Sequence, residues 1–600
     1  MNFVKNIAPI FVASVLLLPI FVLSNIFDGH IWGPFYFLVI TGSIFVIAIS
    51  FYLYINKKIL LNINLNIIEL LMLFTFLYVI GSVVSCKFGL SYASNLYVFG
   101  ILILLIFIAK SWVFNTGKNW HIFFIVSIFM LIAIFEVVLG FLQLGRQYSK
   151  NQDLFKITGT FDNSGIYANY LSIICVFALG LCLHVDLNMK KLRYLSFFTF
   201  FIIIVILPFT QARTSWLAVL IGIITVSWPK IKTISIIKLM IANAKNKLLT
   251  FSFLFAVVFF IFYHLYQYKV QSAKGRLLIY GVSLNMIMDK PVFGHGFNRF
   301  LAEYNIYQAE YFKNHSHTIN AVLADNVRSG FNEFIQVTVE LGLAGLLLFI
   351  GFIVLLFYTK SKSEWEFIVI PAKGALSAVL ICCLFSYPLR VLPIAGCIVF
   401  ILSIIMASNV DRGYNIRIGR QYYIPLALIS TIIAILVCYI QWSDYNARKQ
   451  WKQAIDYTQL NDFEKALPYY QKSYKILNYD GFFLYNYGAE LIEINPVEGV
   501  RILEEATNYL SDNDLYCYLG DGYRALKKYN KAEFNYQLSS LMVPCKFYPR
   551  YQLFKLYCET NQYCKARYIA QSIASMEVKV PSLIVLEIKS EIEEWLIMHK

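Results

Sequence analysis

Charged residues are scarce in this chain. Only 14% of the 600 residues are Asp, Glu, Lys or Arg, against about 25% in a soluble domain, and 59% are hydrophobic. This shortage excludes a soluble globular enzyme and a disordered chain. It predicts a polytopic membrane protein whose charges are kept in the loops. The net charge of +16 then reflects basic cytoplasmic loops rather than a surface for nucleic acid, which we do not expect as a partner.

Motifs for a metal site or a disulfide scaffold are also missing. The 11 cysteines are spread over the whole length, without a CxxC pair or a His and Cys cluster at zinc spacing. We therefore expect no metal and no small disulfide-bonded fold. The N-terminus carries Lys5 and an apolar run but no clear small-residue cleavage site, so we expect a retained first span rather than a removed signal peptide.

Apolar runs near the length that crosses a bilayer recur as far as Trp442. Helices are expected for them, because hydrocarbon offers backbone groups no outside partner. The thirteen expected spans are 7–26, 31–55, 65–86, 96–114, 120–143, 165–185, 194–211, 213–228, 248–267, 333–358, 367–388, 391–408 and 422–442. The sequence thus predicts an all-α bundle in a membrane.

The loops between these runs predict its orientation. With the N-terminus in the cytoplasm every inner loop is basic, as the positive-inside rule requires, although Lys373 falls inside the eleventh run. An odd number of spans places residues 443–600 outside the cytoplasm, together with the loops 144–164 and 268–332. We expect a multi-pass protein of a bacterial inner membrane, with a membrane domain at 1–442 and a periplasmic domain after it.

The C-terminal region is polar, helical in pattern and repetitive, and it holds 19 of the 42 tyrosines. The spacing of a tetratricopeptide repeat is met by Leu519, Gly520, Tyr523, Ala532, Tyr536 and Pro544. Small residues recur at a period of about 33 or 34 as Ala466, Ala532 and Ala566. Four helix pairs fit, and they would stack into an α-solenoid whose concave surface binds protein. The alternative is a rigid cap that only stabilises the membrane domain.

Four cysteines of this region allow two interpretations. They are Cys517, Cys545, Cys558 and Cys564. In an oxidising periplasm they could form two disulfides. Four buried thiols are the equal alternative, because sequence spacing does not determine the distance between Cα atoms.

The outer loop 268–332 breaks the positive-inside pattern. Its basic and imidazole side chains are Lys269, Lys274, Arg276, Lys290, Arg299, Lys313, Arg328, His295, His315 and His317. A guanidinium binds phosphate through two parallel N–H bonds and stays charged at any relevant pH. The loop therefore predicts a site for an anionic ligand on the outer side.

Three segments of the chain resemble a known family. They are Gln211–Leu217 (QARTSWL), then Gly275 and Arg276 followed by Met288–Gly296 (MDKPVFGHG), then Phe331–Gln336 (FNEFIQ) running into Glu340–Gly345 (ELGLAG). In order, spacing and sidedness they look like the core of the superfamily of O-antigen ligases, O-antigen polymerases and bacterial protein O-oligosaccharyltransferases. The resemblance covers about residues 70–405. The protein O-oligosaccharyltransferase branch can also carry C-terminal repeats.

The resemblance implies a glycosyltransferase of the GT-C type. Such a protein moves a preassembled glycan from a polyprenyl diphosphate to a hydroxyl of a protein, of lipid A core or of a growing glycan, with no metal or other cofactor. Arg213 and Arg276 would hold the diphosphate and offset the charge that develops as the glycosidic bond breaks. Arg390 is a candidate third contact from its outer-face position alone. The repeats favour protein as the acceptor.

The sequence departs from the family at the residue that would deprotonate the acceptor. The family commonly has His directly before the Asn of the third motif, and Phe331 stands there. The candidates for the base are His317, His315, His295 and Glu333. A His has a pKa near the working pH, which suits this role. A further alternative is that the arginines supply most of the rate and no strong base is needed.

The candidate residues also have structural alternatives. Arg213 could have no role at the site and only extend its side chain to the membrane–water interface. An Arg at a helix N-terminus, however, opposes the helix dipole. The loop histidines could be solvated surface residues. Asn332 and Asn163 could cap the helices that follow them, yet with Gln211 we expect both to support the site.

Two other classes of protein compete with a transferase. A transporter for lipid-linked sugars should show inverted repeats, and no such duplication is visible. A non-catalytic scaffold that works through its repeats should tolerate the loss of Arg213 and Arg276. Glu69 and Glu136 are intramembrane carboxylates and so are functional candidates by default.

Overall fold

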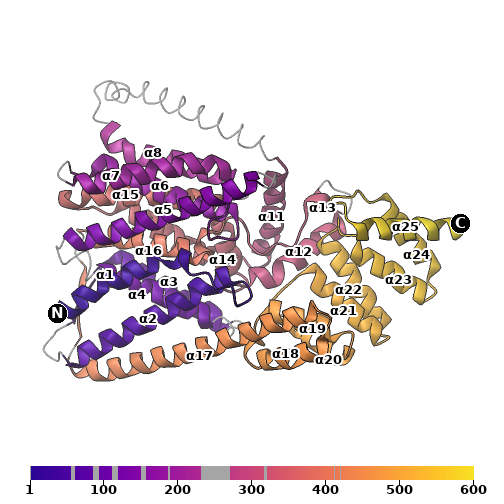
Figure 1. Ribbon diagram of the computed structural model, residues 1–600. Coiled ribbons are helices and arrows are strands. Elements are labelled where there is room, and N and C mark those ends of the chain that lie inside the picture. The colour runs from indigo at the N-terminus through magenta and orange to yellow at the C-terminus, as the bar shows by residue number, and fades with distance from the viewer. Residues whose placement is uncertain are drawn as a thin grey trace.

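The computed structural model describes residues 2–55, 61–85, 93–110, 119–149, 157–186, 189–231, 270–315, 320–410, 413–418 and 420–599. Figure 1 shows a bundle of long helices at one side and a group of shorter helices, from α18 to α25, at the other. The described chain is helical apart from one antiparallel pair of strands. In this pair β1 (Leu61–Leu65) lies beside β2 (Tyr414–Ile418), with Leu61 opposite Ile418.

The bundle helices follow the apolar runs of the sequence. Before the long loop they are α1 (Asn2–Leu16), α2 (Gly29–Ile55), α3 (Ile67–Ser85), α4 (Ala93–Ile108), α5 (Asn119–Ser149), α6 (Ser164–His184), α7 (Lys190–Ile206), the 3-10 turn η4 (Leu207–Thr210) and α8 (Arg213–Ile231). After the loop they are α14 (Glu333–Tyr358), α15 (Glu366–Phe385), the 3-10 turn η6 (Pro388–Arg390), α16 (Leu392–Ala407) and α17 (Tyr423–Thr458).

The expected spans and the helices agree closely. Eleven of the thirteen runs fall on a described helix over most of their length. The first run, 7–26, does not, because α1 ends at Leu16 and only the 3-10 turn Leu18–Ile20 follows it before α2. The ninth run, 248–267, lies outside the described residues. Nine helices of the described chain are long and apolar enough to cross a membrane, and the apolar helices Asn95–Ile108 and Leu392–Ala407 are shorter. The chain is therefore a polytopic membrane helix bundle, and the count of thirteen spans stays a prediction.

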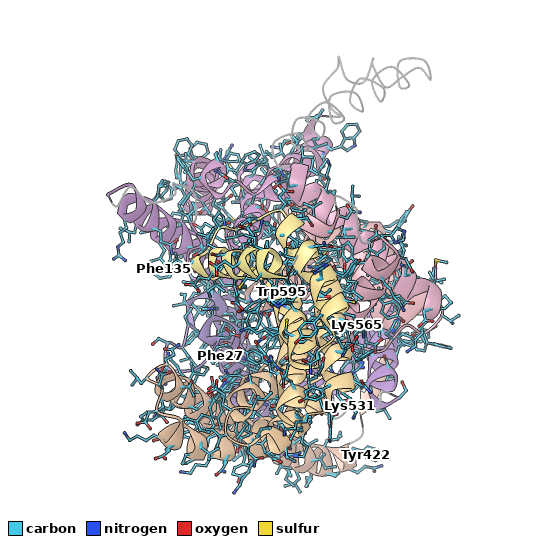
Figure 2. All side chains as sticks on the ribbon, turned by 90° about the vertical axis from the view of Figure 1, so that its right-hand side faces the viewer. Phe27, Phe135, Tyr422, Lys531, Lys565 and Trp595 are labelled. Atoms are coloured by element: carbon cyan, nitrogen blue, oxygen red, sulfur yellow. The ribbon has the colours of Figure 1, made fainter. Side chains whose placement is uncertain are left out.

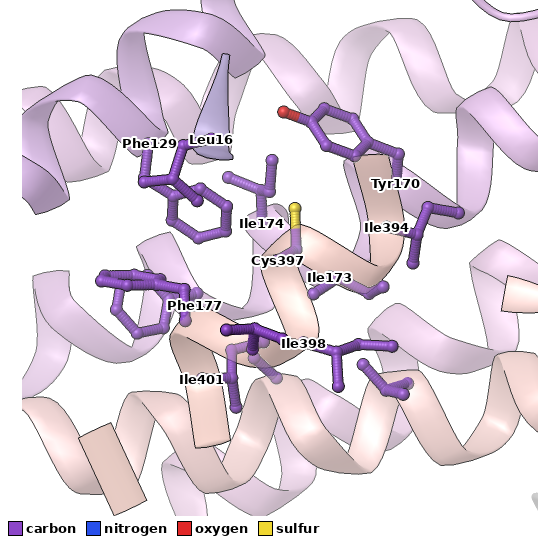
Figure 3. Packing of buried hydrophobic residues seen from close by; sticks show 14 of the residues in the cluster. Leu16, Phe129, Tyr170, Ile173, Ile174, Phe177, Ile394, Cys397, Ile398 and Ile401 are labelled. Carbon is purple, nitrogen blue, oxygen red and sulfur yellow. The ribbon is translucent and has the colours of Figure 1, made fainter. Parts of the chain in front are cut away.

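The centre of the bundle is α6, which is apolar on all sides and is therefore buried. Figure 3 shows Ile174 and Phe177 of α6 beside Cys397 and Ile401 of α16. The Phe177 ring meets that of Phe129 from α5, with 5.6 Å between the centroids. Because α6 is held so tightly, the position of its first residue, which lies beside the candidate site, is determined by the core.

Several charges within the bundle have structural partners. The ammonium group of Lys373, which interrupted the eleventh run, donates to the carbonyl oxygens of Phe357 (2.9 Å) and Thr359 (2.8 Å) at the end of α14. The carboxylate of Glu69 is fully buried and forms an ion pair with Lys110. These contacts account for both charges without a catalytic role.

The expected single span 333–358 contains a break. Inside α14, Gly342 has φ 68° and ψ −172°, so two helical segments meet there. The segment that follows α11 lies against this break, where the His295 N–H donates to the Val339 carbonyl at 2.8 Å. A Cβ at residue 342 would stand 2.1 Å from the carbonyl oxygen of Val292. Glycine is thus required, because L-residues rarely adopt this φ and a side chain has no room.

The long loop 268–332 is mostly helical where the structure describes it. It forms α11 (Val270–Asp289), α12 (Phe300–Asn314) and the short α13 (Asn320–Leu323). In Figure 1, α11 stands across the ends of the long helices, and α12 leads from it toward the C-terminal helices.

The C-terminal helices pack in sequence as the repeat spacing predicts. They are α18 (Phe463–Leu477), α19 (Gly481–Leu491), α20 (Pro496–Ala506), α21 (Asn513–Ala525), α22 (Tyr529–Met542), α23 (Tyr548–Glu559), α24 (Tyr563–Ser575) and α25 (Leu583–Met598). Ala466, Ala532 and Ala566 are fully buried at the expected close approaches. Figure 2 looks onto this domain, with Lys531, Lys565 and Trp595 marked. Its assignment as tetratricopeptide repeats stays a prediction.

The domain boundary and the four cysteines of this region can be compared with their sequence predictions. The boundary after residue 442 falls inside one continuous helix, because α17 extends from the apolar run to Thr458. All four cysteines, Cys517, Cys545, Cys558 and Cys564, are free thiols. Of the two alternatives the structure has the unpaired one, but only Cys517 is buried, while Cys545 and Cys558 are partly exposed and Cys564 is exposed.

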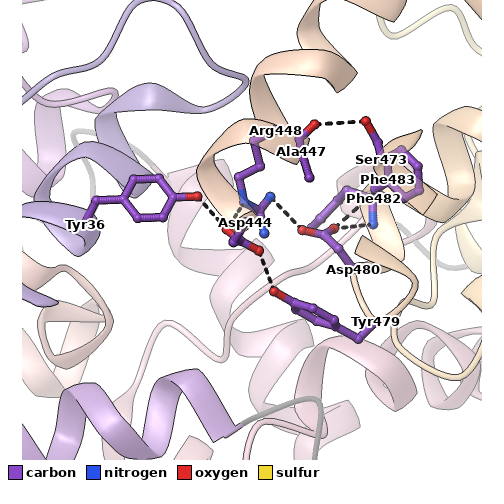
Figure 4. A network of polar contacts seen from close by, with 9 residues as sticks. All are labelled: Tyr36, Asp444, Ala447, Arg448, Ser473, Tyr479, Asp480, Phe482 and Phe483. Atoms are coloured by element: carbon purple, nitrogen blue, oxygen red, sulfur yellow. Dashed lines mark hydrogen bonds and ion pairs between the residues drawn. The ribbon is translucent and has the colours of Figure 1, made fainter. Parts of the chain in front are cut away.

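A buried polar network joins the repeat domain to the bundle (Figure 4). Arg448 on α17 donates to Asp444 at 2.9 Å and to Asp480 at 2.8 Å, and its side chain is 1% exposed. Tyr36 of α2 and Tyr479, which precedes α19, both donate to Asp444, at 2.5 and 2.6 Å. Since charged groups at this depth are costly unless paired, the network holds the two domains in one arrangement.

Candidate functional site

A cavity of about 360 Å³ opens at the end of the bundle that faces the repeat domain. Its walls come from the start of α6, from η4 and α8, from the first half of α11 and from the end of α15. The lining residues are Asn163, Ser164, Gly165, Asn169, Thr210, Gln211, Ala212, Arg213, Thr214, Leu217, Ser272, Ala273, Arg276, Leu277, Tyr280, Phe385 and Ser386. The structure therefore brings together Asn163, Gln211, Arg213 and Arg276, four residues expected at the site.

The turn before α8 positions Arg213. Pro208 is the second residue of the short 3-10 segment, and Gln211 ends it in the left-handed conformation with φ 51°. Its N–H donates to the Pro208 carbonyl at 3.1 Å. This turn places Arg213 at the first position of α8, at the positive end of the helix dipole. Guanidinium and helix end together make one wall of the cavity electropositive.

Arg276 enters the cavity from α11. Burial lowers the pKa of its guanidinium, while Tyr280 and Tyr387 raise it again. No carboxylate pairs with Arg276 among the residues that the structure describes, and its side chain instead lies over the ring of Phe331, 5.7 Å from the centroid. A largely buried cation without an anionic partner favours an anionic ligand, because the charge then regains the stabilisation it lost on leaving water.

An aromatic wall surrounds Arg276. The Tyr280 hydroxyl donates to the carbonyl oxygens of Phe331 (3.2 Å) and Leu384 (3.4 Å), which ties α11 to the ends of α14 and α15. The rings of Phe331 and Tyr387 meet edge to face with 5.4 Å between centroids. Burial raises the pKa of Tyr387, and so does the charge of Asp162, while Arg276 lowers it. These groups therefore lie within electrostatic reach of one another.

Asn163 takes its place through a folded loop before α6. Its side chain accepts from the Gly165 N–H at 2.7 Å and so caps α6, which is the structural role that the sequence allowed for it. The same residue also lines the cavity. The buried carboxylate of Glu136 accepts from the hydroxyl (2.7 Å) and the N–H (3.1 Å) of Thr160. The side-chain oxygen of Gln143 accepts from the N–H groups of Thr158 and Gly159, both at 2.9 Å. Glu136 thus holds the loop before α6, from which Asn163 lines the cavity.

Sequence reasoning missed several lining residues. Asn169 donates to Ser386 and accepts from Ser215, both at 3.0 Å, and so joins α6, α8 and α15 below the cavity. Tyr280 could have been found, because it follows Arg276 by one helical turn and so shares its face. Tyr387, which lies near Arg276 but outside the lining, gives no such signal, since only the packing of distant segments brings it there.

Three other expected residues lie outside the lining. Glu333 is 3% exposed and accepts from the Leu389 N–H at 2.9 Å. The Asn332 side chain caps α14 by accepting from the N–H groups of Phe334 and Ile335, which is the structural role that the sequence allowed for it. Arg390 forms an ion pair with Glu340 at 2.5 Å, which occupies its charge. Their side chains brace the loops around the cavity.

His295 and His315 are also away from the cavity lining. His295 is buried, with Nε2 2.9 Å from the Met286 carbonyl oxygen and Nδ1 2.5 Å from the carboxylate of Glu303. Both ring nitrogens are therefore engaged. His315 lies at the end of α12, stacked on Tyr311 with 4.6 Å between centroids. His317 lies outside the described residues. In the described ranges no three His, Cys, Asp or Glu side chains gather as metal ligands would.

Residues 198–350 match the family model of the O-antigen ligase domain. No protein among the curated ones matches the chain. The matched segment contains Arg213, Arg276 and the break at Gly342, and it therefore includes the two cationic walls of the cavity. It covers about a quarter of the chain. The match supports an O-antigen ligase domain in this segment of the chain.

Proposed function

We propose that this protein transfers a preassembled glycan from a polyprenyl diphosphate to an acceptor hydroxyl, and that the acceptor is a protein. The observation that carries the proposal is the meeting of Arg213 and Arg276 in one cavity at the end of the bundle. Two guanidinium groups and a helix N-terminus provide the donors that a diphosphate needs. The family match supports a glycan ligase in general.

In the proposed reaction the acceptor oxygen attacks the anomeric carbon, and the bond from that carbon to the diphosphate oxygen breaks. The configuration inverts, and the polyprenyl diphosphate leaves with one more negative charge. Arg213 and Arg276 stabilise this charge as it develops, because their positions are determined before the ligand arrives. The step needs no nucleotide and no metal in this scheme.

The acceptor hydroxyl loses its proton in this reaction, and a base must accept that proton. Asp162 is an exposed carboxylate directly before Asn163 in the cavity wall, and we propose it as the proton acceptor. His295 and Glu333 are less suited, because their polar atoms already have partners within the protein. His317 stays a candidate from the sequence. If the arginines supply most of the rate, the carboxylate contributes only a small factor.

The choice of a protein acceptor rests on the helical-repeat domain. Stacked helix pairs offer an extended surface for polypeptide. In this proposal the repeat domain, and with it the cavity, lies in the periplasm of a bacterium, and the basic inner loops support that orientation. Ligation to lipid A core is the second candidate and glycan polymerisation the third.

A deletion strain tests the proposal. It is complemented with wild type, Arg276→Ala, Arg276→Lys or Arg501→Ala, and glycan is measured separately on proteins and on lipopolysaccharide. Arg501 is an exposed residue of the repeat domain and serves as the matched control. We expect protein-linked glycan to return fully with wild type and with Arg501→Ala, and not to return with Arg276→Ala. Arg276→Lys should give a partial return, because lysine keeps the charge without the planar fork. A change confined to lipopolysaccharide would replace protein by lipid A core as the acceptor.

A further inference from the structure

Helix α11 has an apolar edge that no described residue covers. One face of the helix packs its buried Leu278, Val282 and Met286 into a small core with α12. Along another face Leu277, Leu284 and Met288 are 60%, 54% and 78% exposed. Large apolar side chains at one-turn and two-turn spacing form a continuous strip, which we call the α11 strip. A helix surrounded by water would not be expected to carry such a strip.

The α11 strip begins beside the cavity at the end of the bundle. Leu277 lines the cavity and so points toward the ends of α6 and α8. Leu284 and Met288 follow on the same face of the helix, two and three turns further on. At that point the helix has passed the cavity. In Figure 1 the helix crosses the bundle end at a steep angle to the long helices, as a helix lying in the plane of a bilayer would.

The strip also joins a surface that belongs to a membrane span. Beyond α11, the chain is hydrogen-bonded to α14 just after its break, where the Ala344 N–H donates to the Val292 carbonyl at 3.2 Å. Val292 and Phe293 are exposed there, and so are Leu343 and Leu347 on α14. The apolar surface of the span therefore continues onto the loop and onto α11.

We infer that α11 is an interfacial helix, with its strip against the acyl chains of the leaflet on the repeat-domain side. Lys274 and Lys290 are exposed at its two ends, where their ammonium groups can reach lipid phosphates. The arginine cavity then opens at the head-group level, beside Leu277. On the basis of the proposed function, an isoprenoid diphosphate would reach Arg276 along the strip without leaving the lipid phase.

Site-specific photo-crosslinking tests this inference on the full-length protein. Benzoylphenylalanine replaces Leu284 or Met288, and the protein is illuminated in vesicles of phosphatidylethanolamine and phosphatidylglycerol. Leu347 on α14 is the control for lipid contact, and Tyr568 on α24 is the control for water, since both are about equally exposed. Adducts are identified by mass spectrometry, which needs no enzymatic activity. A failure of the proposed function would leave this readout unchanged.

We expect lipid adducts at residues 284 and 288 at a yield similar to that at Leu347 and about tenfold above that at Tyr568. Yields at the level of Tyr568 would show that the strip faces water and would overturn the inference. Adducts to a second copy of the chain would overturn it as well, since the strip would then be a contact between copies. Leu284→Asn and Met288→Asn, which shorten the apolar strip, should raise the KM for a lipid-linked donor without changing the folded state.

Discussion

The guanidinium of Arg276 lies over the ring of Phe331, 5.7 Å from its centroid. Phe331 stands where the resembled family commonly has His. In the proposed function its ring supports the cation that binds the diphosphate and does not supply a base. An aromatic ring under a partly desolvated guanidinium contributes about 0.5 to 2 kcal/mol. The ring thus keeps the cation above it oriented toward the cavity.

Phe331→Leu should therefore lower kcat/KM for glycan transfer by about 2- to 30-fold, because the packing remains while the ring quadrupole is lost. Phe331→Tyr keeps the ring and should stay close to wild type. Steady-state kinetics with a lipid-linked donor measure both. Equal losses in the two variants would show that the ring does not act through Arg276.

Asp162→Asn should reduce the rate of transfer by about 10² to 10⁴, the usual contribution of a general base. The amide keeps the size of the side chain but cannot take the proton. Asp186→Asn is the matched control, since Asp186 is an exposed carboxylate just beyond the other end of α6. Single-turnover kinetics separate this chemical step from binding. A rate for Asp162→Asn within a few-fold of the control would favour catalysis by the arginines alone.

Gly342→Ala should destabilise the protein by at least about 3 kcal/mol, because a left-handed φ is strained for alanine and its Cβ would overlap the Val292 carbonyl. Gly145→Ala in α5, where a Cβ meets no atom within 4 Å, should change stability by about 1 kcal/mol or less. Thermal unfolding in detergent compares the two variants. Similar midpoints would mean that the break in α14 is not a requirement of the fold.

Arg448→Met should loosen the junction between the two domains. It leaves the carboxylates of Asp444 and Asp480 near each other without their cation, at a cost of about 3 to 5 kcal/mol. Arg501→Met removes an exposed ion pair with Glu498 and should cost about 1 kcal/mol or less. Hydrogen exchange of α17 to α19 in the full-length protein reports the difference. Unchanged protection in Arg448→Met would show that the network does not hold the domains.

The stability of the repeat domain should depend on Asp521. Burial raises the pKa of this carboxyl to about 6, although the hydroxyl of Tyr536 donates to it at 2.6 Å. The folded state thus binds a proton between the unfolded pKa of 3.8 and about 6. Stability should fall by about 2 to 3 kcal/mol as the pH rises through this range.

Asp521→Asn should remove that slope, since the amide does not titrate. Hydrogen exchange of α21 and α22, corrected for the intrinsic rate at each pH, measures it. A wild-type protein whose protection in these helices rises from pH 4 to pH 6 would have the opposite sign and would disprove the assignment.

Much of the bundle is predictable from the sequence because a membrane leaves one physical signal, the length of an apolar run. The run 333–358 coincides with α14 to the residue. The same signal hides the break at Gly342, because the length of the run does not report the backbone conformation inside it. It also hides the extension of α17 past residue 442, because the polar part of that helix packs against water-exposed helices.

The candidate site was predictable only in part. Arg213 and Arg276 could be predicted to lie together because both belong to motifs of one resembled family, and such motifs mark segments that meet in space. His295 and Arg390 also carry suitable chemistry, but their partners Glu303 and Glu340 are brought to them by folding. A charge in a sequence does not reveal whether the fold already neutralises it, and that distinction separates these two residues from Arg276.

The central claim is that Arg213 and Arg276 act on one diphosphate. The most direct measurement is the release of polyprenyl diphosphate from a lipid-linked glycan by the purified protein in vesicles, with acceptor present. We expect Arg213→Ala and Arg276→Ala each to lower kcat by about 10² to 10³, with the double variant far less affected than the product of the two, and Arg501→Ala to match wild type. Release at the wild-type rate by either single variant would contradict the account.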